Sequence, residues 1–143
     1  MCIRDSSKIA AGRFEHVLVL GMGGSSLCPD VLRRTFGRQA GFPALGILDS
    51  TVPAQVRRIG GELDLARTLF IVASKSGGTI EPNVALAHFL EEASAQLGPE
   101  EARRHVVAIT DPGSSLHALA QREGFLAVVY GDPESGGRFS GSP

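Results

Sequence analysis

The sequence predicts an α/β fold, a doubly wound αβα sandwich around a five-stranded parallel sheet, on the basis of three observations. Five short apolar runs lack polar alternation, which is typical of strands buried on both faces. Longer stretches with helical spacing separate these runs, and prolines and glycines mark the boundaries. Strands and helices that alternate in this way connect through right-handed crossovers, which place helices on both faces of a parallel sheet.

The expected strands are the apolar runs at 17–20, 45–48, 69–73, 106–109 and 126–130. Between them, apolar side chains recur three and four residues apart in two stripes. The longer stripe consists of Leu86, Phe89, Leu90, Ala93 and Leu97, and the shorter one of Leu27, Val31, Leu32 and Phe36. Each stripe predicts a helix with one apolar face.

Helix boundaries are expected at prolines and glycines. Three prolines stand near the expected helix starts, where a missing N–H group costs little: Pro53, Pro82 and Pro112. Glycines fall near the expected helix ends: Gly37, Gly60, Gly61, Gly98 and Gly124. The chain therefore alternates five strands with four helices.

The composition fits one globular domain and excludes several partners. The chain has 143 residues, 43% of them hydrophobic, which excludes a disordered protein. With a net charge of -1, the chain has no strong positive electrostatic field that would attract nucleic acid or an anionic membrane. We therefore expect neither as a partner. Cys2 and Cys28 lack metal-ligand spacing, so we expect no metal and a reduced, cytoplasmic compartment.

The two ends of the chain differ from the rest. Residues 1–7 have no periodicity that leads into the first strand, and we expect them to be a non-native or disordered leader. The expected domain covers residues 8–143. The chain stops just after a glycine-rich turn with no closing element, so we expect this domain to be truncated at its C-terminal end.

The loop after the first expected strand indicates an anion site. It reads GMGGSS at 21–26 and runs directly into a helix. Glycines let the backbone approach a ligand, and a helix N-terminus presents free N–H groups with a partial positive charge. Taken alone, the loop is equally well explained as a tight turn that needs glycine for its geometry.

The loop after the third expected strand has a similar composition. It reads SKSGGT at 74–79, with three hydroxyls, one ammonium and two glycines before a helix that we expect Thr79 to cap. Hydroxyl and backbone donors can surround a phosphate while Lys75 supplies a point charge. Ligands of such sheets bind beyond the carboxyl ends of the strands, and a winding switch there can bring the two loops to opposite sides of one crevice.

Three ordered motifs resemble the sugar-isomerase (SIS) domain of the glucose-6-phosphate isomerase family. They are VLVLGMGGSS at 17–26, SKSGGTIE at 74–81 and GGRFS at 136–140. Together with LDST at 48–51, the residues of the first two motifs are most similar to those of bacterial members of the family, including members fused to a transaldolase. The resemblance implies a SIS domain of the flavodoxin-like type that acts on a phosphohexose without a cofactor, and a homodimer for the full-length protein.

The resemblance also implies a role for each matching residue. Gly24 and Ser25 would border the substrate and its phosphate. The residues that would hold the phosphate are Ser74, Lys75, Ser76, Gly77, Gly78 and Thr79. Gly137 and Arg138 would approach the reacting carbons, where the guanidinium steadies an enediolate, and Glu81 would support the histidine that opens the sugar ring. The family's catalytic glutamate and this histidine lie beyond the last motif, so we expect the chain to supply the phosphate-binding half without the base.

Other polar residues have ordinary structural interpretations. The four histidines lie outside the two loops, and we expect them to be solvated or at the edge of the core: His16, His88, His105 and His117. Asp111 and Asp132 precede prolines and are expected in turns. We expect Cys28 to be buried, and Arg33, Arg34 and Arg38 to form a solvated helix face.

Two alternative functions stay open. The first is a sugar-phosphate sensor without catalysis, although a sensor needs no arginine for an enediolate. The second is a dinucleotide-binding domain in which Asp49 holds a ribose. Ser26 replaces the third glycine of that motif, and a dinucleotide site needs only one phosphate loop.

Overall fold

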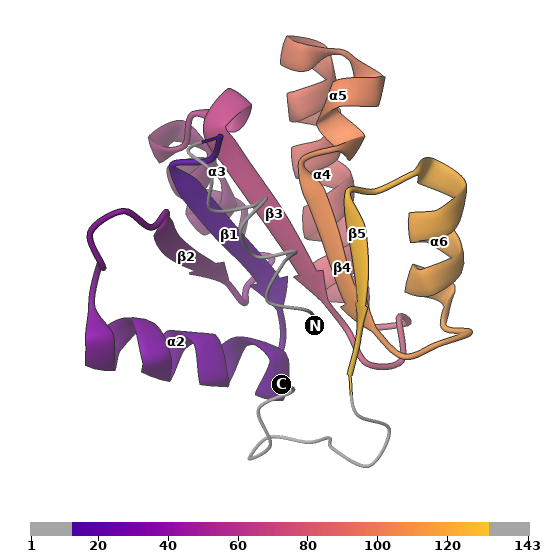
Figure 1. The fold of residues 1–143 in the computed structure, drawn as a ribbon, viewed down its shortest axis with the longest axis horizontal. Coiled ribbons are helices and arrows are strands. Elements are labelled where there is room, and N and C mark those ends of the chain that lie inside the picture. The colour runs from indigo at the N-terminus through magenta and orange to yellow at the C-terminus, as the bar shows by residue number, and fades with distance from the viewer. Residues whose placement is uncertain (1–12, 132–143) are drawn as a thin grey trace.

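The fold of this protein is known from a computed structural model that describes residues 13–131 (Figure 1). Its sheet has five parallel strands: β1 (His16–Gly21), β2 (Ala44–Leu48), β3 (Thr68–Ala73), β4 (Val106–Thr110) and β5 (Ala127–Tyr130). The order across the sheet is β2-β1-β3-β4-β5. Each strand matches its expected bounds to within one residue, so the predicted parallel α/β sheet is confirmed.

The helices of the described residues include two short elements that the sequence did not predict. The longer helices are α2 (Gly24–Phe36), α3 (Pro53–Glu62), α4 (Ile80–Leu97) and α6 (Ser115–Glu123). The short ones are α5 (Pro99–Arg103) and the 3₁₀ turn η1 (Leu65–Arg67), which span too few residues to show a period. None of the helices in this part of the chain combines the length and apolarity needed to cross a membrane.

Most of the expected helix boundaries are confirmed. Pro53 is the first residue of α3. Three glycines follow helix ends with positive φ angles, as expected: Gly37, Gly98 and Gly124. Gly60 and Gly61 also lie near a helix end, within the last turn of α3, which continues to Glu62.

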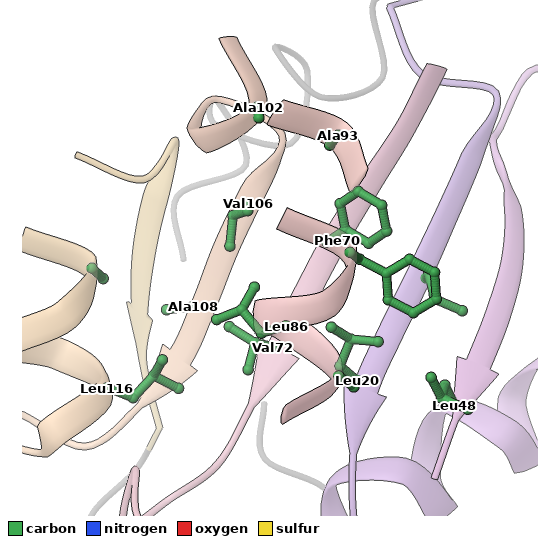
Figure 2. Close-up of a cluster of buried hydrophobic side chains, with 14 of the residues drawn as sticks. Leu20, Leu48, Phe70, Val72, Leu86, Ala93, Ala102, Val106, Ala108 and Leu116 are labelled. Carbon is green, nitrogen blue, oxygen red and sulfur yellow. The ribbon is translucent and has the colours of Figure 1, made fainter. Parts of the chain in front are cut away.

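The main core lies on one face of the sheet, under α3, α4, α5 and α6. Strand residues on this face include Leu20, Phe70 and Val72, which are at most 1% exposed. Phe70 stacks on Phe89 of α4 with ring centroids 5.4 Å apart. Figure 2 shows how the strand residues meet Leu86 of α4 and Leu116 of α6. Burial of this apolar surface is the main stabilising term of the fold.

The opposite face of the sheet is covered differently. Only α2, among the described helices, lies on this side, and Figure 1 shows it apart from the other helices. The one side chain of α2 that is buried is Ser26. The predicted apolar stripe is exposed instead, with Leu27 at 46%, Val31 at 53%, Leu32 at 49% and Phe36 at 64%. The helix was predicted correctly, but within residues 13–131 its apolar stripe has no covering layer.

Candidate functional site

The candidate site lies where the winding of the sheet reverses. From β1 the chain crosses to β2 on one side, and from β3 it crosses to β4 on the other side. Gly21 pairs with Ala73, so the carboxyl ends of β1 and β3 stand next to each other. Crevices at such switch points are the usual ligand sites of doubly wound sheets. The two donor-rich loops therefore leave the sheet from neighbouring positions.

One cavity of about 300 Å³ is lined by both loops. Gly24 and Ser25 come from the first loop, and Ser74 and Lys75 from the second. The rest of the wall is mainly apolar and comes from α2 and the sheet: Val19, Cys28, Pro29, Leu32, Leu45, Ile71, Ala73 and Ile109. The volume lies at the lower end of the range for small-molecule sites. The structure thus brings four of the predicted site residues around one space.

The first loop is held by hydrogen bonds among its own residues. Gly23 has a φ of 58°, a conformation that favours glycine, and it precedes the first residue of α2. The Ser26 hydroxyl donates to the Gly23 carbonyl at 3.1 Å, and the Ser25 N–H donates to the Met22 carbonyl at 3.2 Å. The amide of Ser25 therefore already has an acceptor within the loop.

The second loop is also organised by internal hydrogen bonds. The buried Ser74 hydroxyl donates to Thr79 Oγ1 at 3.1 Å. The Gly77 N–H donates to the Ser74 carbonyl at 3.2 Å, and the Gly78 N–H donates to Ser76 Oγ at 3.2 Å. Thr79 occupies the N-cap position of α4 as expected, but its side chain makes no capping bond. Its hydroxyl accepts from Ser74 instead, which joins the two ends of the loop.

Several predicted site residues do not line the cavity. They are Ser76, Gly77, Gly78, Thr79 and Glu81. Glu81 lies in the first turn of α4, where a carboxylate is favourable next to the positive end of the helix dipole. Gly137 and Arg138 lie outside the described residues, as does the predicted leader at 1–7.

The cavity wall also contains polar residues to which the sequence reasoning gave no site role. Thr110 and Asp111 line it from the end of β4, and Cys28 lines it from α2. Cys28 is only half-buried, so the expectation that it is buried was wrong. Asp111 does lie in a turn, and its N–H donates to the Lys75 carbonyl at 3.2 Å. Only the strand order, in which β4 is next to β3, could have placed Thr110 and Asp111 near Lys75.

The predictions for the exposure of His105 and of the arginines in and after α2 had different outcomes. His105 was expected at the edge of the core or in solvent, but it is only 2% exposed, and its Nδ1 lies 3.0 Å from the Thr68 carbonyl oxygen. Arg38 is exposed but lies beyond the end of α2, whereas Arg33 and Arg34 form an exposed basic face of the helix, as expected. There, a hydrogen bond from Arg33 holds the pKa of Asp30 below its usual value, with a smaller contribution from Arg34.

Comparison with known families identifies relatives of this chain. A family model described as phosphoglucose isomerase matches residues 5–124. A glucose-6-phosphate isomerase of Thermus thermophilus is 40% identical over 127 residues, which cover 88% of this chain and 30% of the relative. That of a Nostoc species is 39% identical over 135 residues, which cover 91% of this chain and 25% of the relative. The chain thus spans less than a third of the length of these relatives.

Solved structures share the fold. A hypothetical protein from Thermus thermophilus superimposes with a TM-score of 0.85 at 38% identity, over 98% of this chain and 34% of that chain. A glucose-6-phosphate isomerase from Chlamydia trachomatis gives 0.76 at 26% identity, over 88% and 24%. The sugar isomerase domain of an RpiR transcription factor from Sphaerobacter thermophilus, at 22% identity and a TM-score of 0.50, covers 78% of this chain and 54% of its own and shows likeness of fold alone.

Proposed function

The chain belongs to the phosphoglucose isomerase family, and from this membership we propose that it forms the phosphate-binding part of an enzyme that interconverts glucose 6-phosphate and fructose 6-phosphate. The observation that carries the proposal is the shared cavity at the switch point, lined by Gly24 and Ser25 on one side and by Ser74 and Lys75 on the other. Hydroxyl groups and one ammonium are suitable partners for a phosphate dianion.

The cavity would contribute to catalysis by positioning the sugar. Aldose-ketose isomerisation moves a proton between adjacent carbons through an enediolate, so it needs a base and a positive group where charge develops. A phosphate held at one end of the sugar fixes the reacting carbons relative to these groups. We assign the positive group to Arg138 with Gly137, and support of the ring-opening histidine to Glu81. We propose that the base comes from another part of the protein.

The second loop would contact the phosphate mainly through Lys75, next to Ser74, which lines the same cavity and whose hydroxyl donates to Thr79. Ser76 and Thr79 are proposed as additional hydroxyl donors, and Gly77 and Gly78 as the backbone of the loop. These four residues do not line the cavity, and the N–H groups of Gly77 and Gly78 already donate within the loop. We therefore expect Lys75 to contribute more to phosphate affinity than any of them.

Calorimetry on the 143-residue chain tests this function. We expect glucose 6-phosphate and fructose 6-phosphate to bind, and glucose and NAD to give no heat. Lys75→Ala should weaken phosphosugar binding about 10- to 100-fold, since it removes a charge-assisted hydrogen bond. Because Lys75 is exposed, the free energy of unfolding should change by less than about 1 kcal/mol.

The matched control is Arg104→Ala, which removes an exposed cation at the opposite end of the sheet, before the start of β4. It should leave phosphosugar affinity unchanged. Heat from NAD without a response to either phosphosugar would reverse the proposal in favour of a dinucleotide-binding domain. An equal loss of stability and affinity in Lys75→Ala would identify a structural lysine.

A further inference from the structure

The hydroxyl of Thr110, at the end of β4, reaches the backbone of the second loop. Thr110 is 2% exposed. Its Oγ1 donates to the Ser74 carbonyl at 2.7 Å and has a longer contact of 3.3 Å with the Lys75 carbonyl. The same Oγ1 lies 2.7 Å from Ser114 Oγ. Thr110 thus joins the loop that bears Lys75 to the N-cap residue of α6.

The donor in each of these hydrogen bonds can be assigned in only one way. A hydroxyl has a single proton, and a carbonyl oxygen can only accept. Since the Thr110 proton points to the Ser74 carbonyl, Ser114 must donate to Thr110. Ser114 Oγ in turn accepts from the His117 N–H at 3.0 Å. The bonds therefore run from the first turn of α6 through two hydroxyls to the loop, and such bonds strengthen one another.

The Thr110 hydroxyl is not the only partner of these carbonyls. The Ser74 carbonyl also accepts from the Gly77 N–H at 3.2 Å, and the Lys75 carbonyl accepts from the Asp111 N–H at 3.2 Å. Loss of the hydroxyl would therefore leave neither carbonyl without a hydrogen bond. What would be lost is the constraint on where the two carbonyls lie, and with them the position of the Lys75 backbone.

A second contact also fixes the loop against α6. A Cβ atom added at Gly77 would lie 2.6 Å from the Leu116 N and 2.8 Å from Ser115 Oγ. The backbone of the loop therefore touches the first turn of α6 directly. The loop therefore meets the start of α6 at two points, through Thr110 and through Gly77.

We propose that Thr110 is a positioning residue, which holds Ser74 and Lys75 in the geometry that binds phosphate and relies on Ser114 at the start of α6. This inference rests on the proposed function, because the ligand in question is the phosphate of a phosphosugar. It assigns a role in phosphate binding to Thr110 and to the start of α6, neither of which belongs to the sequence motifs.

Calorimetry with glucose 6-phosphate on three variants of the 143-residue chain tests this role. Thr110→Val keeps the shape of the side chain without the hydroxyl, and we expect affinity to fall about three- to tenfold, as for one lost hydrogen bond. Thr110→Ser keeps the hydroxyl and should restore affinity to within about twofold of the unchanged chain. Thr68→Val is the matched control, because the buried Thr68 hydroxyl also donates to a carbonyl, that of Asp64, at the other end of the sheet.

The control separates positioning from stability. Thr68→Val should lower the thermal midpoint about as much as Thr110→Val but leave affinity unchanged. Unchanged affinity in Thr110→Val, or equal losses in the Ser and Val variants, would overturn the inference. If Thr110→Val does not fold, Ser114→Ala removes the preceding hydroxyl in the same row of hydrogen bonds. Weaker binding of glucose 6-phosphate by this variant supports the inference, and unchanged binding overturns it.

The design also separates this inference from the proposed function. If the unchanged chain binds glucose 6-phosphate and Lys75→Ala does not, while Thr110→Val binds normally, only the positioning role fails. If the unchanged chain gives no heat with glucose 6-phosphate, the proposed function fails and this inference fails with it.

Discussion

Gly77 shows how one residue without a side chain determines the shape of the second loop. Its φ of 72° lies in a region that L side chains rarely adopt, and its backbone touches the first turn of α6. Asn83 of α4 adds a further constraint, because its Nδ2 donates to the Gly77 carbonyl at 2.9 Å. The loop is therefore held from two helices at this residue.

We expect Gly77→Ala to lower the free energy of unfolding by about 2–4 kcal/mol, because it combines a strained backbone with a steric clash. Gly78→Ala is the matched control. Its added Cβ would meet only Ser76 Oγ, at an ordinary 3.8 Å, and its cost should stay within about 0.5 kcal/mol. Urea denaturation of both variants checks this, and similar costs for the two would contradict the geometry described for the loop.

At the residue scale, the sequence motifs contain four of the residues that line the cavity, Gly24, Ser25, Ser74 and Lys75. Ser74 and Lys75 follow an apolar run directly, so the loop could be recognised from its composition. Thr110 could not be recognised in this way, because a single threonine at the end of a strand has no distinguishing pattern. The role that we propose for it depends on a contact of 2.7 Å between residues that are 36 positions apart.

The two helices with predicted apolar stripes, α4 and α2, differ in how they are packed. In α4 the stripe is buried, with Leu86 at 3% and Phe89 fully covered. In α2 the corresponding side chains are about half exposed. Periodicity indicates which side of a helix is apolar, but it does not show whether another element covers that side. The sequence therefore could not distinguish the buried stripe of α4 from the exposed stripe of α2.

This difference predicts unequal costs for the same substitution in the two helices. Leu86→Ala should lower the free energy of unfolding by about 2–5 kcal/mol, since it leaves a cavity in the core. Leu32→Ala, on α2, removes a side chain that is 49% exposed and should cost less than about 1 kcal/mol. Denaturant unfolding of the two variants measures both values. Equal costs would mean that α2 is packed as tightly as α4.

At the scale of the whole molecule, the order of the strands creates the candidate site. The composition of each loop could be recognised in the sequence, but each loop alone is also compatible with an ordinary turn. Their approach depends on β1 and β3 being neighbours with Gly21 paired to Ala73, which is a property of the strand order of the whole sheet. The central claim is therefore that two loops distant in sequence bind one phosphorylated sugar.

The most direct test is a titration of the ¹⁵N-labelled chain with glucose 6-phosphate, followed by NMR. We expect the amide signals of Gly24 and Ser25 in one loop, and of Ser74 and Lys75 in the other, to shift along curves with a single dissociation constant. The Arg104 signal, at the far end of the sheet, should not move. Shifts confined to one loop, or two different dissociation constants for the two loops, would contradict a shared phosphate site.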